Sequence, residues 1–79
     1  MAYLLYQGHT IVSSAVYEDV SGKWRLTACV SWQENRNEDR FHFIRNSPER
    51  FCRSEDAENA GLEAGKCWVQ RKAKQTVAS

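Results

Sequence analysis

Residues 23–33 decide the fold of this 79-residue chain, and they read KWRLTACVSWQ. Apolar side chains occupy every second position from Trp24 to Trp32, and the positions between them are mostly charged or hydroxylic. Successive side chains of a β-strand point to opposite faces, so this alternation predicts a strand with one buried face. It is the clearest strand signal in the chain.

The segments on either side of this strand share its period of two. Residues 11–17 (IVSSAVY) are rich in β-branched side chains, and the Ser-Gly pair at 21–22 supplies a turn before the central strand. After the central strand, residues 34–39 are polar and include two Asn, and residues 40–45 (RFHFIR) alternate again. We therefore expect three antiparallel strands.

The pattern becomes helical after Ser54, which is a favourable N-cap residue followed by two acids. Small side chains then recur at helical spacing up to Trp68, which suits close packing on the sheet. Gly61 and Gly65 each cost about 1 kcal/mol relative to Ala, so they either allow this close approach or break the helix. The sequence predicts one α+β domain of β-β-β-α order over residues 1–79. Its expected parts are a sheet at about 9–46, a loop at 47–53, a helix at about 55–73 and a frayed tail at 74–79.

The pairing of the second and third predicted strands follows from the polar segment between them. If residues 34–39 form the turn, Gln33 lies opposite Arg40, and both Phe41 and Phe43 face the helix. The predicted sheet core is then Ile11, Ala15, Tyr17, Trp24, Leu26, Ala28, Val30, Trp32, Phe41 and Phe43. The helix is expected to add Ala57, Ala60, Gly61, Ala64 and Trp68.

Charge and cysteine content limit the class of protein. Lys and Arg total 11 and Asp and Glu total 10, a net charge of +1, which excludes a strongly cationic nucleic-acid coat and an acidic tail. Three cysteines without a CxxC pair favour a reducing compartment. No apolar run reaches the ~20 residues that span a bilayer, and the N-terminus lacks signal-peptide features. We expect a cytoplasmic protein.

No catalytic or ligand-binding pattern stands out. His9, His42 and the cysteines do not stand at the short spacings of zinc ligands, and the glycines form no phosphate-binding loop. An open sheet face also leaves a nucleophile in contact with water. We expect no enzymatic activity, no cofactor, no metal, no small-molecule substrate and no membrane partner.

The alternate face of the sheet combines apolar, hydroxylic and basic side chains with almost no acids. The first interpretation is a contact surface for another protein or for a second copy of the chain. Its residues are Val12, Val16, Thr27 and Ile44. The alternative is a sheet-type DNA-binding transcriptional regulator, against which the near-neutral charge counts. Its nucleic-acid contacts are Arg25, Ser31, Arg36, Arg40 and His42. A third interpretation is an ordinary sheet face that residues 3–6 cover.

Several short motifs occur in a characteristic order along the chain. They are Tyr6-x-Gly8-x-x-Ile11, Gly22-x-Trp24-Arg25, Arg40-Phe41-x-Phe43-Ile44-Arg45, Phe51, Ser54-Glu55-Asp56-Ala57 and Trp68-Val69. This order resembles small bacterial β-β-β-α proteins of unknown function and is distantly similar to the short family labelled HlyU-type transcriptional activator. The resemblance covers roughly Tyr6 to Val69 and implies the same fold and a role in transcription. It carries over no site residues, and the basic ending after Val69 departs from a more acidic one in that family.

Overall fold

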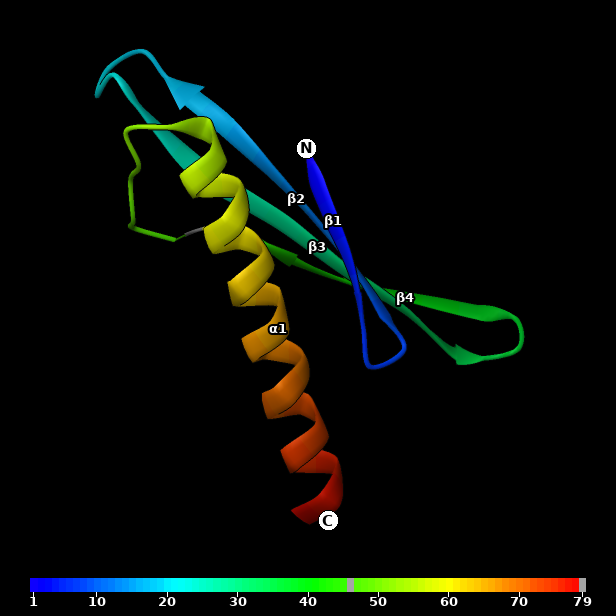
Figure 1. The fold of residues 1–79 in the computed structure, drawn as a ribbon. Helices are drawn as coiled ribbons and strands as arrows, with labels where there is room; N and C mark the ends of the chain where they lie inside the picture. Colours follow the sequence, from blue (N-terminus) through cyan, green and yellow to red (C-terminus); the bar gives the residue numbers. More distant parts are fainter. Residues whose placement is uncertain (46, 79) are drawn as a thin grey trace.

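The computed structural model describes residues 1–45 and 47–78, with side chains described as far as residue 74. Its elements are β1 (Ala2–Tyr6), β2 (His9–Glu18), β3 (Lys23–Asn35), β4 (Glu38–Ile44) and α1 (Ser54–Ala78). The strands form one antiparallel sheet in the order β1-β2-β3-β4, and α1 lies along a single side of it (Figure 1). The α+β class with a C-terminal helix is confirmed, but the sheet has four strands where three were expected.

β1 is the strand that the sequence pattern did not predict. It pairs with β2, with Leu4 opposite Ile11. The connecting residues Gln7 and Gly8 both have positive φ, 48° and 75°, as a two-residue type I′ hairpin requires. The sheet therefore begins at Ala2 instead of near residue 9, and the N-terminal segment extends the edge of the sheet without covering its alternate face.

The pairing of β3 with β4 is one residue away from the predicted register. A bulge at Gln33–Asn35 adds a residue to β3 before the turn. A shift of one residue turns every side chain of β4 to the other side of the sheet. Phe41 and Phe43 therefore leave the predicted core, and His42 and Ile44 take their places beneath α1.

The strand pairing divides the side chains between two faces, and α1 covers only one of them. The covered side, the helix face, carries Leu4, Tyr6, Ile11, Ser13, Trp24, Leu26, Ala28, Val30, Trp32, His42 and Ile44. The other side, the open face, carries Tyr3, Leu5, Thr10, Val12, Ser14, Val16, Arg25, Thr27, Cys29, Ser31, Phe41 and Phe43.

α1 runs without interruption to Ala78, so the expected end near residue 73 and the frayed tail after it are wrong over the described residues. The remaining predicted bounds, at Asn46 for the sheet and Ser79 for the tail, lie outside the described residues. Neither interior glycine breaks the helix, and both are buried against the sheet. A β-carbon at Gly61 would overlap the side chain of Ser13, so a larger residue would force the helix away from β2.

The buried core lies between α1 and the two middle strands. Its residues are Ile11, Ser13, Leu26, Ala28, Val30, Ala57 and Val69. Partly buried side chains surround the contact of Ile11, Val30 and Val69, and they are Leu4, Tyr6, Trp32, Ile44, Leu62 and Trp68. Three residues of the predicted core are exposed instead: Tyr17, Phe41 and Phe43. The prediction fails mainly on β4, where the bulge reverses the two faces.

Candidate functional site

The open face has large apolar side chains on its outer strands and small ones in its middle. Tyr3 and Leu5 on β1 are each 72 % exposed, and Phe41 and Phe43 on β4 are 61 % and 53 % exposed. Between them, β2 and β3 contribute mainly Val, Thr, Ser and Cys. The outer strands thus form two apolar rims beside a lower centre. Grouped exposed apolar side chains of this kind mark interaction sites more often than plain solvated surface.

A hollow of about 280 Å³ lies in this centre beside β4. Its lining is Val12, Ser14, Thr27, Ala28, Cys29, Phe43 and Arg45. The guanidinium of Arg45 lies over the ring of Phe43, 4.5 Å from the ring centroid, which adds a cation to the apolar rim. Burial raises the pKa of the Cys29 thiol, and the charge of Arg45 offsets part of that rise. Cys29 therefore forms a small apolar part of the floor and is a poor nucleophile.

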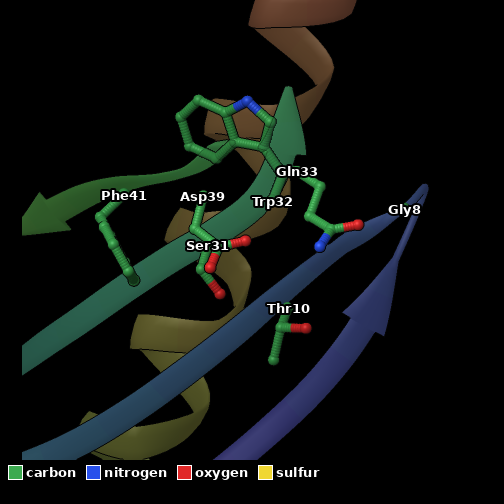
Figure 2. Close-up of a pocket in the computed structure, with 7 residues that line it drawn as sticks. All are labelled: Gly8, Thr10, Ser31, Trp32, Gln33, Asp39 and Phe41. Atoms are coloured by element: carbon green, nitrogen blue, oxygen red, sulfur yellow. The ribbon is translucent and has the colours of Figure 1, made fainter. Parts of the chain in front are cut away.

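A second hollow, of about 390 Å³, opens at the end of the sheet beside the β1–β2 turn (Figure 2). Its lining is Gly8, Thr10, Ser31, Trp32, Gln33, Asp39 and Phe41. Figure 2 shows Thr10, Ser31 and Asp39 on three neighbouring strands. Over the described part of the chain, the side chains of these three residues and of Gln33 make no hydrogen bond or ion pair. This end of the open face therefore offers polar groups to a partner or to water.

Charged groups stand mainly at the two ends of the open face, and Arg45 adds a cation at the side of the central hollow. At the β2–β3 turn, Glu18 accepts a 2.6 Å hydrogen bond from Arg50 Nε, and its carboxylate lies 3.6 Å from Arg25 Nε. The hydrogen bond from Arg50 is the main reason that the pKa of the Glu18 carboxyl lies below its usual value, and burial opposes it. At the other end lies the exposed Asp39, the second residue of β4.

The residues predicted for a protein-contact surface fall on two sides of the sheet. Val12, Val16 and Thr27 lie together on the open face, as the alternation of β2 and β3 predicts. Ile44 lies on the helix face against the core, because the bulge in β3 reverses β4. Phe41 and Phe43, which the sequence pattern assigns to the core, occupy the open face in its place.

The residues predicted for nucleic-acid contact do not form one surface. Arg25 and Ser31 lie on the open face, and Arg36 lies in the turn between β3 and β4. Arg40 and His42 lie on the opposite side of the sheet, where their strand partners are Trp32 and Val30 of the helix face. A groove of DNA that met Arg25 would thus not meet His42.

Sequence reasoning missed an aromatic cluster at one edge of the helix face. The ring of Trp68 stacks on His42 with a centroid distance of 4.4 Å and an interplanar angle of 9°, and Trp32 follows at 5.2 Å. Lys72 Nζ lies 3.4 Å from the centroid of Trp32, and its burial there lowers the pKa of Lys72. This cluster fastens α1 to β4. The signal for it was the alternation of residues 40–45. The predicted register of these residues was one residue away from the observed one, so it placed His42 on the wrong face of the sheet.

Over the described residues, no helix is long and apolar enough to cross a membrane, and no group of three or more His, Cys, Asp or Glu side chains is placed to hold a metal ion. No protein-family model matches the sequence, and no match is found among curated proteins or among solved structures. The resemblance to the transcriptional activator family therefore stays a prediction, and the functional argument rests on the open face.

Proposed function

We propose that this protein is a self-associating interaction module, in which the β4 side of the open face meets a second copy of the chain. The observation that carries the proposal is the exposure of Phe41 and Phe43, two aromatic side chains of β4 on the open face. Each is an apolar side chain whose transfer out of water is favourable by about 25 cal/mol per Å². A complex in which a second copy covers these side chains would therefore be stabilised by the burial of their apolar surface.

The charges favour a second copy over a strongly charged partner. The net charge of the chain is +1, and both signs occur at the margins of the open face. A strongly acidic or basic partner would meet charges of its own sign there, whereas two copies in a two-fold arrangement bring unlike ends together.

The experiment is sedimentation equilibrium from about 10 μM to about 1 mM, where weak dimers are detected. We expect the weight-average mass to rise from 9.1 kDa towards twice that value. Phe41→Ser combined with Phe43→Ser should abolish the rise, because both side chains are more than half exposed in the monomer. Val20→Ser is the matched control, since Val20 is fully exposed in the β2–β3 turn. A wild-type chain that stays monomeric throughout would contradict the proposal.

The alternative, a sheet-type DNA-binding transcriptional regulator, has less support. Arg25 is engaged with Glu18, and the five basic and hydroxylic residues proposed for DNA contact do not share a face. Neutralisation of DNA phosphates supplies most of the affinity of such proteins. A chain with a net charge of +1 neutralises few phosphates. Chemical-shift changes at Arg25 and Ser31 on adding duplex DNA at low salt would revive this alternative.

A further inference from the structure

β4 is an edge strand whose central residues lack the usual protection against pairing with another strand. It stands at the end of the sheet order, so one of its long sides has no strand partner in the described part of the chain. Edge strands of soluble proteins commonly carry Lys, Pro or a bulge that blocks a further strand. The central residues of β4, Phe41 to Ile44, include none of these.

The backbone groups that β4 leaves unpaired are identified by a bridge at the start of β3. The N–H and C=O of Trp24 both bond to Phe51, on the side of β3 away from its partner Tyr17 in β2. Backbone groups alternate in direction along a strand, so the even residues of β3 bond towards β4. Their partners in β4 therefore bond inward, and the N–H and C=O groups of Phe41 and Phe43 point outward.

We propose that two copies of the chain pair along these outward groups, antiparallel, with His42 opposite His42 of the second copy. This arrangement rests on the proposed function and names its geometry. Phe41 then bonds to Phe43 of the second copy, and Phe43 to Phe41 of the second copy. The two sheets become one eight-stranded sheet, with the four Phe side chains grouped on the open face, where paired aromatic side chains stabilise a sheet.

The charges of Asp39 in β4 and of Arg45, the residue after β4, select this register. With His42 at the centre, Asp39 lies opposite Arg45 of the second copy, and the symmetry repeats the pair. Both residues fall on the open-face side of the strand, and cross-strand pairs of opposite charge are favourable while like charges are not. Over the described residues, Asp39 makes no ion pair, and the side chain of Arg45 rests on Phe43. On the open-face side, the segment from Asp39 to Arg45 is therefore complementary to itself, with an acid at one end, Phe41 and Phe43 in the middle and a base at the other end.

The opposite edge of the sheet lacks this selectivity. β1 (AYLLY) has no charged side chain, so no pair of charges sets its register with a second copy. Both ends of β1 are also tied to α1. The N-terminal amine bonds to Glu58 at 2.6 Å, and the Tyr6 hydroxyl accepts a 2.7 Å hydrogen bond from Gln70 Nε2. The β1 edge thus serves as the matched control.

A charge exchange tests the register. Asp39→Arg and Arg45→Asp should each weaken the dimer about tenfold, because each converts two attractive cross-strand pairs into repulsive ones. The double variant restores the pairs in reversed order, and its dissociation constant should return to within about threefold of wild type. Far-ultraviolet circular dichroism confirms that each variant is folded. A double variant as weak as the sum of the single variants would overturn the proposed register.

A proline exchange tests the edge. Phe43→Pro removes one outward N–H without removing a hydrogen bond to β3, and Leu5→Pro does the same at the β1 edge. We expect the first variant to be monomeric and the second to dimerise. The opposite result is a dimer that survives Phe43→Pro and both charge variants but is lost in Thr27→Lys, at the middle of the open face. That result would retain self-association and overturn pairing through β4. A wild-type monomer at every concentration would contradict the proposed function itself. Should Phe43→Pro fail to fold, the charge exchange decides alone.

Discussion

Gly65 of α1 lies directly against Ile11 of β2: a β-carbon at Gly65 would stand 2.5 Å from Ile11 Cγ2 and 3.2 Å from Cγ1 and Cδ1. Ile11 is fully buried and belongs to the central contact of the core, so it has no room to withdraw. The distance between helix and sheet is therefore set by the absence of a side chain at Gly65 and, one turn earlier, at Gly61.

Gly65→Ala should destabilise the protein by about 1–3 kcal/mol, as overpacking of a core does. Helix propensity alone predicts the opposite sign, since Ala is favoured over Gly by about 1 kcal/mol inside a helix. Urea denaturation measures the difference. Asn59→Ala, at an exposed position of the same helix, is the control and should be neutral or slightly stabilising. A Gly65→Ala variant at least as stable as wild type would show that the close packing is absent in solution.

Ser13→Ala should stabilise the protein by about 1 kcal/mol. Ser13 is fully buried, and over the described residues its hydroxyl oxygen has no hydrogen-bond partner. Replacing it with Ala removes the cost of burying an unpaired polar group and leaves no large cavity. The midpoint of thermal or urea unfolding reports the change. Ser14→Ala, on the open face of the same strand, should stay within about 0.5 kcal/mol of wild type.

Glu18 should contribute to stability near neutral pH and lose that contribution in acid. Its folded-state pKa lies below the unfolded value because Arg50 donates a hydrogen bond to it. The unfolded state therefore binds the proton first as the pH falls, and the contribution is lost as the pH passes from the unfolded pKa through the folded one. The free energy of unfolding of Glu18→Gln should lie below that of wild type at about pH 7 and approach it at about pH 3. An unchanged difference at both pH values would contradict the assigned ion pair.

Cys29 should react with iodoacetamide more slowly than the other two cysteines. Its thiol is half-buried and its pKa is raised by that burial, whereas Cys52 and Cys67 are exposed. Alkylation requires the thiolate, so we expect a rate at least about tenfold lower at Cys29. Mass spectrometry of timed digests gives the three rates. In concentrated urea the rates should converge, and faster labelling of Cys29 in the folded protein would contradict the structure.

The sequence was sufficient to predict the elements whose two faces differ in chemistry. In β3, apolar and polar positions alternate from Trp24 to Trp32, so the pattern alone assigns its buried face. The capping residue Ser54 marked the start of α1 to within one residue. Val12, Val16 and Thr27 were assigned to the alternate face on the same grounds, and they lie on it.

By itself, then, the sequence determined an antiparallel sheet under one helix, because periods of two and of 3.6 residues are local properties of the chain. Tertiary structure alone decided which side of β4 is buried. Residues 41–44 are Phe, His, Phe and Ile, so either face of this strand suits a core, and a one-residue bulge made the choice. The same holds for β1, whose five residues are apolar throughout and show no alternation. The candidate site lies largely on these two strands, which is why its rims became visible only when the strands were paired.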